Sequence, residues 1–211
     1  MQHGQPDCLD DDTKVNAVTL QLLLLELVPT SMRVSQKLLE TQDVEDIETR
    51  INHMLSTLKH DLPGTVCILH SDTINKDDVG LRLQLFGYNV GMKLCEVLLY
   101  KSIPPSLTNV LEIMKFVCRD IWKCIFNKQM DNLRTNHRGT FVLIDNSHKL
   151  IVNNNSAKGI HDTIQKSKVY LWFSCGIIQG VLANFGLESN VTAEISNFPT
   201  VTFNILTGIN N

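Results

Sequence analysis

The stretch NLRTNHRGTFVLIDN, residues 132–146, decides how this 211-residue chain folds. Its second half contains TFVLI, a run of apolar and β-branched residues that predicts a strand. Its first half places Arg134, His137 and Arg138 close to a Gly-Thr step. This half is either a charged loop that binds phosphate or catalyses a reaction, or the structural corner that leads into the strand.

The element that follows Gly139 separates these two interpretations. A cationic pair before glycine holds phosphate best where a helix N-terminus points at the ligand. Here a strand follows, so no helix dipole supports an anion. We therefore interpret the stretch as a helix-to-strand corner, in which Thr135 and Asn136 satisfy local backbone groups and Gly139 permits close packing.

Three long helical patterns precede the corner. The first begins at Val15, and Pro29 is expected to end or kink it, although the segment up to Glu40 can continue it. The second extends from Asp77 to about Tyr100. The third is predicted over residues 106–129 and is apolar around most of its circumference, which is typical of a buried helix.

The part of the chain after the corner supplies more strands. HKLIV, residues 148–152, predicts the hairpin partner of TFVLI, and a polar loop over residues 153–167 leads to a helix over residues 168–185. Apolar and polar residues alternate in residues 191–196 and 201–205, as expected for strands with one buried face. The predicted fold class is α+β, with a four-stranded antiparallel sheet of two hairpins and several long helices packed on one side.

The domain organisation is simple. Residues 1–14 are predicted to be a disordered acidic N-terminus, and residues 15–211 a single domain. A weakly patterned, polar segment at about 41–75 is predicted to be a variable insertion, with one short amphipathic helix near residues 47–58.

Two pairs of glycines stand four residues apart inside helical patterns. Gly87 and Gly91 form one pair, and Gly176 and Gly180 form the other. Glycine lowers helix propensity, so a pair on one helical face needs a compensating reason. We expect each pair to let another helix approach closely.

Composition excludes several functional classes. The net charge is -3 and no long Lys/Arg run occurs, which argues against nucleic-acid binding.

The N-terminus lacks the basic and apolar regions of a signal peptide, so we predict a reduced, cytosolic compartment with free thiols. The apolar run Leu20–Val28 contains Glu26 and ends at Pro29, whereas a spanning helix needs about 20 apolar residues.

The sequence contains none of the common nucleotide-binding, metalloprotease or serine-hydrolase motifs. Cys118 and Cys124 are too loosely spaced for a typical structural zinc site. The acidic run at residues 10–12 could attract a divalent cation, but a solvated terminus is the simpler interpretation. We predict no catalytic residue, no metal and no cofactor, and hence a protein that is not an enzyme.

Four segments of the chain resemble one known family. They are LFGYNVGMKLCEVLL (85–99), IMKFVCRDIWKCIFNKQMDNLRTNHRGTFVLIDN (113–146), FSCGIIQGVLANFGLES (173–189) and FPTVTFNI (198–205). Together they resemble the subunit-6 type of the small subunits of the transport protein particle (TRAPP) complex, over about residues 79–206. The segments at 41–75 and 153–167 depart from that pattern.

The resemblance implies a non-catalytic subunit of a cytoplasmic tethering complex, peripheral to ER and cis-Golgi membranes, that acts in ER-to-Golgi and Golgi traffic. It implies other TRAPP subunits as partners, especially the third-subunit type, and a Rab GTPase whose nucleotide exchange the assembled complex promotes. In the third subunit a cysteine after the second helix carries an acyl chain. The corresponding linker here, YKSIPPSL, has no cysteine, so acylation is not implied.

The amount of apolar helix surface independently favours a partner. Three long helices carry more apolar surface than one four-stranded sheet covers, and a stable interface buries about 800 Å² per partner. We expect the first helix and residues 81–98 to form a dimer surface. The residues expected to contribute to it are Leu24, Leu27, Phe86, Val90 and Leu94.

Two alternatives stay open at this point. Each of the five predicted interface residues could instead belong to an ordinary core. The chain could also be a module that binds a small hydrophobic ligand such as an acyl chain, because the glycine-spaced helices and the two apolar faces of TFVLI could line a cavity.

Overall fold

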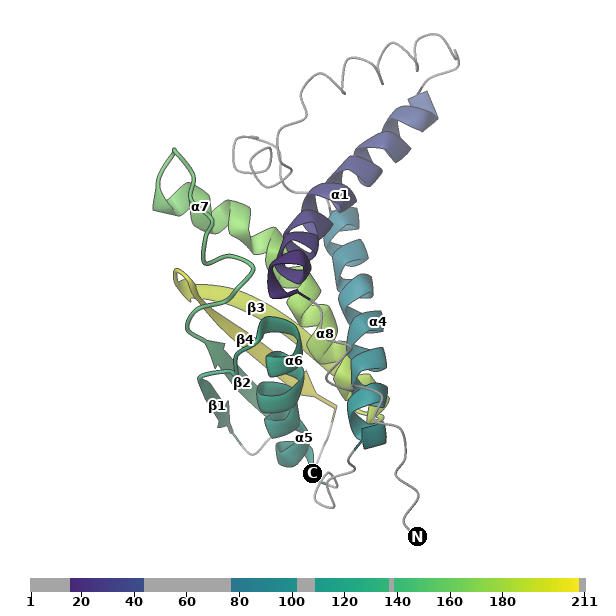
Figure 1. Ribbon diagram of the computed structural model, residues 1–211, viewed down its shortest axis with the longest axis vertical. Coiled ribbons are helices and arrows are strands. Elements are labelled where there is room, and N and C mark those ends of the chain that lie inside the picture. The colour runs from purple at the N-terminus through teal and green to yellow at the C-terminus, as the bar shows by residue number, and fades with distance from the viewer. Residues whose placement is uncertain (1–15, 44–76, 102–108, 137–138, 209–211) are drawn as a thin grey trace.

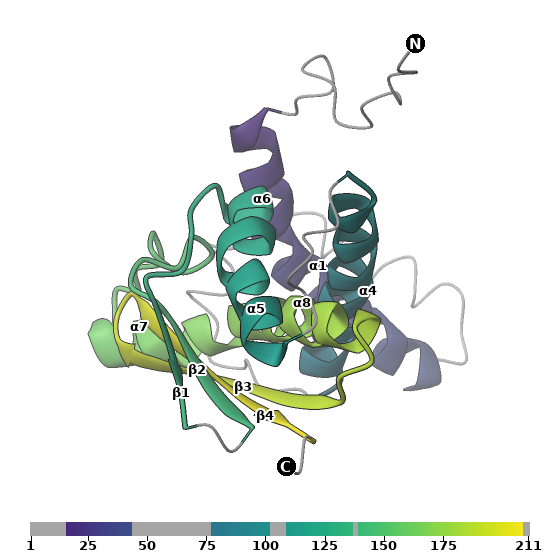
Figure 2. The ribbon, with the colours of Figure 1, turned by 90° about the horizontal axis from the view of Figure 1, so that it is seen from below.

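The computed structural model describes residues 16–43, 77–101, 109–136 and 139–208 (Figure 1). The helices and strands follow in this order: α1 (Ala17–Asp43), α4 (Asp77–Lys101), α5 (Val110–Phe116), the π-helical turn η2 (Val117–Ile121), α6 (Trp122–Phe126), β1 (Asn132–Thr135), β2 (Thr140–Asp145), α7 (Ile160–Ser167), the 3-10 turn η3 (Lys168–Tyr170), α8 (Leu171–Asn184), β3 (Ser189–Asn197) and β4 (Thr200–Thr207). The predicted α+β class is confirmed. Figure 2 shows the sheet with α5, α6 and α8 on one side of it, and α4 and α1 farther out.

The sheet is antiparallel, with the strand order β1-β2-β4-β3. Leu143 pairs with Phe203 across the central strands, and both side chains are completely buried. Because strand side chains alternate between the two faces, Phe141 and Ile205 are buried on the same face as this pair. The sheet therefore contributes one apolar face to the core, and α5, α6 and α8 cover it.

The predicted strand at residues 148–152 is wrong. The amides of Ile151 and Val152 both donate to the carbonyl oxygen of His148, so this segment is a tight turn. Leu150 and Ile151 are nevertheless buried. A turn that points apolar side chains into the core has the same local composition as a strand, which explains the error.

The partner of β2 is instead β1, and it lies within the stretch first interpreted as a corner. Arg134 belongs to this edge strand and is exposed, while His137 and Arg138 fall outside the described residues. The predicted helix-to-strand corner thus lies between two paired strands, β1 and β2. As expected, Asn136 satisfies a local group, because its Oδ1 accepts a hydrogen bond from the Thr140 amide at 3.1 Å. Gly139 has a φ of 81°, a conformation that favours glycine.

The helix boundaries differ from the predicted ones in several places. Helix α1 continues through Pro29 to Asp43, so proline does not end it. The third predicted helix begins after Asn109, whose side chain caps it, and ends before Asn127, which adopts a left-handed conformation. Residues 160–167 form helix α7, although they were predicted to lie in a loop.

Several predictions cannot be compared with the structure. The predicted disordered N-terminus and most of the predicted insertion at 41–75, including the short helix near 47–58, lie outside the described residues. Residues 41–43 of that insertion belong to α1.

The four paired glycines bring α4 and α8 into backbone contact. A Cβ atom added to Gly87 would lie 2.1 Å from the carbonyl oxygen of Phe173, and one added to Gly180 would lie 2.1 Å from that of Tyr88. Gly91 and Gly176 are equally close to backbone oxygens of the opposite helix. Such distances exclude every side chain larger than hydrogen, so the predicted close helix approach is confirmed.

We expect Gly87→Ala to lower the free energy of unfolding by about 1–3 kcal/mol or more, because the methyl group meets rigid backbone and forces the helices apart. The matched control is Gly80→Ala on the same helix. There the nearest atoms belong to the half-exposed Trp172 side chain, at 2.9 Å, which can move aside. Urea unfolding of both variants measures the difference, and equal losses would contradict a backbone contact as the cause.

Candidate functional site

Helix α1 crosses the N-terminal end of α4, and these two helices carry most of the large apolar side chains that the described residues expose (Figure 1). We call these side chains the α1/α4 surface. Its members on α1 are Val18, Leu22, Leu23, Val34 and Leu38, and its members on α4 are Leu81, Leu85, Phe86, Val90, Val97 and Tyr100. Exposed apolar groups in such number are typical of surfaces that take part in protein–protein contacts.

The five residues predicted for the interface occupy different positions. Phe86 and Val90 lie one turn apart on α4 with 47% and 38% of their surfaces exposed. Leu27 and Leu94 are partly buried and pack against the core, and Leu24 is buried within it. Phe86 and Val90 are the two of the five that project from the surface, and which of the five residues contact a partner stays a prediction.

Sequence reasoning missed the most exposed members of this surface. Leu22, Leu23 and Leu81 each have more than 60% of their surface exposed. Apolar residues surround the first half of α1, so its periodicity does not reveal which side faces the core. The signal for a partner was the surplus of apolar residues itself, not their spacing.

Length and composition alone would also let Ala17–Leu38 of α1 cross a membrane. The sequence argument against a span assumed that the helix ends before Pro29, and that assumption is wrong. In the fold, one side of α1 packs against α4 and the core, while Arg33 and Glu26 form an exposed ion pair at 2.7 Å. A helix that buries one apolar side in its own fold and another against a partner has the same composition as a spanning helix.

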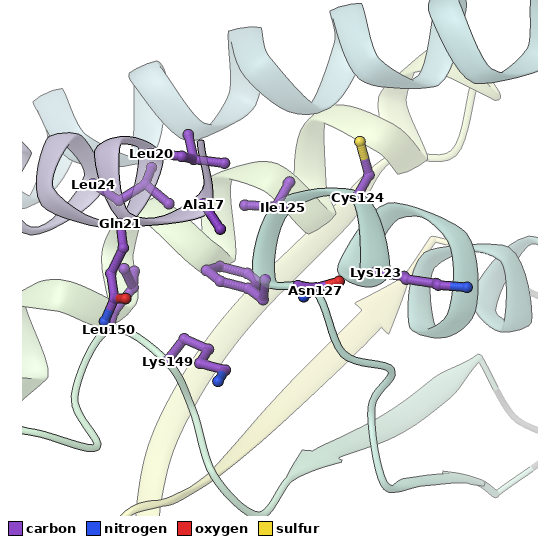
Figure 3. A pocket seen from close by; sticks show the side chains of 11 residues that line it. Ala17, Leu20, Gln21, Leu24, Lys123, Cys124, Ile125, Asn127, Lys149 and Leu150 are labelled. Atoms are coloured by element: carbon purple, nitrogen blue, oxygen red, sulfur yellow. The ribbon is translucent and has the colours of Figure 1, made fainter. Parts of the chain in front are cut away.

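A pocket of about 340 Å³ opens beside the first turns of α1 (Figure 3). Leu20 and Leu24 of α1 face Ile125 and Leu150 across it and make much of the lining apolar. The remaining lining residues are Ala17, Gln21, Lys123, Cys124, Phe126, Asn127 and Lys149. The pocket thus combines an apolar interior with two lysines and no acidic side chain.

A buried hydrogen-bonded chain of Ser174, His148 and Asp145 lies elsewhere in the core. The Ser174 hydroxyl lies 3.1 Å from Nε2 of His148, and Nδ1 of that ring lies 2.9 Å from Oδ2 of Asp145. These are the distances of a serine-hydrolase triad. We call this group the buried triad. No sequence motif predicts this group, because Ser174 lies on α8, whereas Asp145 and His148 lie at the end of β2 and in the turn that follows it.

Burial prevents the triad from acting on a substrate. All three side chains have 0% of their surface exposed, and the His148 ring packs against Trp122, Phe126 and Phe203 at centroid distances of 5.7, 5.1 and 5.8 Å. A nucleophile needs an open path and donors for the developing oxyanion. Here the group instead satisfies buried polar atoms and fixes the packing between β2 and α8.

Asp145 is the centre of this group. Its carboxylate accepts a hydrogen bond from Nε1 of Trp122 at 2.9 Å and forms an ion pair with Lys128, in addition to its contact with His148. Burial alone would raise the pKa of Asp145. The hydrogen bond and charge of His148, together with Lys128 and Trp122, overcome that effect and hold the pKa well below its usual range.

The described cysteines are unsuited to nucleophilic chemistry. Burial raises the pKa of Cys95 to about 11 and those of Cys118 and Cys175 to about 12, and it also raises the pKa of Cys124. All four are free thiols. Within the described ranges, no three His, Cys, Asp or Glu residues come together in a way that could hold a metal ion.

Comparisons with known proteins identify the family to which the chain belongs. The sequence model of the family described as transport protein particle (TRAPP) component matches residues 20–207. Trafficking protein particle complex subunit 6B of Mus musculus is 39% identical over 125 residues, which make up 59% of this chain and 76% of that protein. Subunit 6A of Homo sapiens is 38% identical over 124 residues, 59% of this chain and 75% of that protein.

Among the solved structures with a similar fold is a trafficking-complex subunit. It is the crystal structure of a trafficking protein particle complex subunit 3 from Naegleria fowleri, covalently bound to palmitic acid. The likeness has a TM-score of 0.56 at 13% identity and covers 92% of this chain and 98% of that one. At this identity the likeness concerns the fold alone.

The buried triad predicts a specific acid sensitivity. A depressed folded-state pKa stabilises the fold fully above the unfolded value of about 3.9, and this stabilisation is lost as the pH falls through that value toward the folded pKa. We expect Asp145→Asn to lower the free energy of unfolding at pH 7 by about 3 kcal/mol, because it removes the partner of a buried ion pair. We also expect the variant to lose less stability than the parent between pH 5 and pH 3.

Urea unfolding at several pH values measures both effects. The control is Asp120→Asn, which removes a half-exposed carboxylate that forms an ion pair with its neighbour Arg119. This control should leave the acid sensitivity unchanged. An Asp145→Asn variant with the parent's pH profile would contradict the role assigned to the carboxylate.

Proposed function

Because the chain belongs to the transport protein particle (TRAPP) component family, we propose that it is a non-catalytic structural subunit of a TRAPP complex, of the subunit-6 type. The curated relatives that support the subunit type are named subunits 6A and 6B. The buried triad supports the non-catalytic part of the proposal, because it offers a substrate no access.

The α1/α4 surface is the observation that carries the proposal. In this interpretation the chain pairs with a subunit of the third-subunit type, and the exposed side chains of Phe86 and Val90 are buried in the pair. Leu22, Leu23 and Leu85 extend the same contact along the two helices. Burying several such side chains, each worth about 1.5–3 kcal/mol, supplies the free energy that a stable pair needs.

The pair then serves the assembled complex. We place the complex at the cytoplasmic face of ER and cis-Golgi membranes, where it tethers vesicles and promotes nucleotide exchange on a Rab GTPase. This chain would contribute by holding its neighbours in position, so its own contact with the membrane is indirect. Omitting it from a reconstituted complex should change assembly more than the intrinsic exchange chemistry.

The acyl-chain alternative loses both of its supports. The space beside each of the four glycines is filled by the backbone of the opposite helix, so no ligand fits between the two helices at these positions. The two faces of β2 also have an ordinary explanation, since Phe141 and Leu143 face the core while Val142 and Ile144 are half-buried on the other side of the sheet. Palmitic acid belongs to the Naegleria fowleri protein and is not transferred to this chain.

We expect Phe86→Glu combined with Val90→Glu to abolish pairing with a third-subunit partner, because each substitution places a charge in a desolvated contact. Loss of even one such anchor typically weakens an interface by about 2 kcal/mol, or roughly 30-fold. Co-expression followed by size-exclusion chromatography measures the pairing, with the parent chain expected to form a 1:1 species.

The matched control is Ile160→Glu, since this side chain is 61% exposed on α7, away from the α1/α4 surface. It should pair normally. A parent chain that remains a well-behaved monomer beside the partner would contradict the proposed function. Equal loss in both variants would contradict the assignment of the surface.

A further inference from the structure

Within the described residues the sheet has two edges, and they differ in how well they are protected. Strand β1 forms one edge, which is four residues long and exposes Arg134. Strand β3 forms the other edge, and its nine residues contain no proline, no lysine and one charged side chain, Glu194. Proteins protect edge strands by shortness, charge, proline or a covering element. By these criteria β3 is the edge that is open to another strand.

The register of the sheet shows which backbone groups of β3 point outward. In an antiparallel sheet, successive residues point their backbone groups alternately to one side and to the other. The Thr207 amide donates to the carbonyl oxygen of Gly139 at 2.9 Å, so Thr207 faces β2 and its β3 partner Ser189 points outward. The Gln179 side chain agrees, because its Nε2 donates to the Ser189 carbonyl oxygen at 3.2 Å. By alternation, the next outward-pointing residues are Val191, Ala193 and Ile195.

These three residues have unused hydrogen-bonding groups. Within the described part of the chain, no hydrogen bond reaches their outward N–H and C=O groups. Gln179 closes the beginning of the edge, and an irregularity in the pairing between Ile195 and Asn197 ends it. The open stretch Val191–Ile195 spans about 17 Å at 3.3–3.4 Å per residue. It therefore offers a regular ladder to one short extended segment.

The apolar face of the sheet continues to this edge. Phe203 and Val201 of β4 are completely buried, and their partners on β3 are Ala193 and Ile195. Both partners pack against the core but are only partly buried. A strand added beside them would cover them further if its side chains on that face were apolar.

The other face of β3 indicates the charge of the occupant. Thr192 and Glu194 are exposed there, and Glu194 has no cationic residue beside it on its own strand. Opposite charges on directly paired residues of neighbouring strands stabilise the pair. We propose that the β3 edge binds an extended segment of another protein as an added strand, with apolar side chains beside Ala193 and Ile195 and a lysine or arginine opposite Glu194.

A second copy of the chain is a poorer occupant of the same edge. Antiparallel pairing of two β3 strands about Ala193 would place the two Glu194 side chains at diagonal positions, about 7–8 Å apart, with no cation on either strand. A foreign segment with a basic residue avoids this repulsion. The edge also lies apart from the α1/α4 surface, because α8 stands between the sheet and α4 (Figure 2). Both contacts can therefore form on one molecule.

Amide exchange followed by NMR tests the edge in the full-length chain. We expect the amide protons of Val191, Ala193 and Ile195 to exchange at least tenfold faster than those of Thr192 and Glu194, which bond to β4. The probe is a ten-residue peptide that alternates valine with threonine or lysine. At saturation it should slow the exchange of the first three amides at least tenfold and leave the other two unchanged.

Fluorescence anisotropy of the labelled peptide measures its affinity for the edge. A peptide of the same composition, shuffled so that the alternation is lost, should bind at least fivefold more weakly. We expect Ala193→Pro to weaken binding of the alternating peptide about tenfold, because it removes an outward N–H group. Proline is tolerated where the N–H faces away from the sheet, so the melting temperature should stay near that of the parent. Thr192→Pro is the matched variant and should lower it, because this amide bonds to β4.

Charge variants test the residue opposite Glu194. We expect Glu194→Lys to weaken binding of the lysine-containing peptide about threefold, and replacement of the peptide's lysines by glutamate to restore it. The control is Arg134→Glu on the β1 edge, which should leave the affinity unchanged. The variant that combines Phe86→Glu with Val90→Glu should also bind the peptide as the parent does. Failure of the edge and failure of the proposed pairing are therefore separate results.

Three outcomes would overturn the proposal. The first is a peptide that binds equally well after shuffling, or that binds a folded Ala193→Pro variant as tightly as the parent. The second is an exchange pattern without alternation along β3, or one that saturating peptide does not change. These exchange rates and the charge variants decide the matter even if Ala193→Pro does not fold. The third is self-association that Ala193→Pro removes, which would assign the edge to a second copy of the chain.

Discussion

The backbone contact between α4 and α8 is the constraint on which the rest of this fold depends. Four glycines remove every side chain from the seam, so the two helices approach until the carbonyl oxygens of one nearly touch the α-carbons of the other. Each glycine lowers the helical propensity of its own segment by up to about 1 kcal/mol. The close backbone packing that the glycines allow offsets this loss of helix stability, and a larger residue would prevent that packing. Because α8 also covers the sheet, the seam fixes α4, and through it α1, relative to the strands.

This arrangement explains why the chain has a surplus of apolar surface. With α8 taken up by the sheet and by α4, helices α4 and α1 bury only one side each in their own fold. Their remaining sides carry the α1/α4 surface, whose side chains are not covered by any other described part of the chain. A family whose members assemble into a multi-subunit complex can use such a surface without altering its core. The fold thus separates the residues that determine stability from those that would determine assembly.

The sequence allowed the fold class to be predicted because long helices and alternating strands leave periodic patterns. It also revealed the helix seam, since glycine pairs have few other uses inside a helix. Short elements were harder to predict. Strand β1 is polar because it lies at a sheet edge, so the apolar turn at 148–152 was mistaken for the partner of β2. The interface residues stay a prediction: Phe86 and Val90 are exposed, whereas Leu24 is buried in the core. The sequence could not separate these positions, because apolar residues all round a helix do not indicate which side faces inward.

The buried triad has a consequence for how activity is inferred from geometry. A search that matches serine, histidine and aspartate by distance alone would classify this chain as a hydrolase, since Ser174, His148 and Asp145 satisfy the usual hydrogen-bond criteria. What distinguishes the chain from such an enzyme is the lack of solvent access to these three groups, which are completely buried. Hydrogen-bond geometry of this kind can therefore arise from core packing alone, and it identifies an active site only where solvent and substrate can reach it.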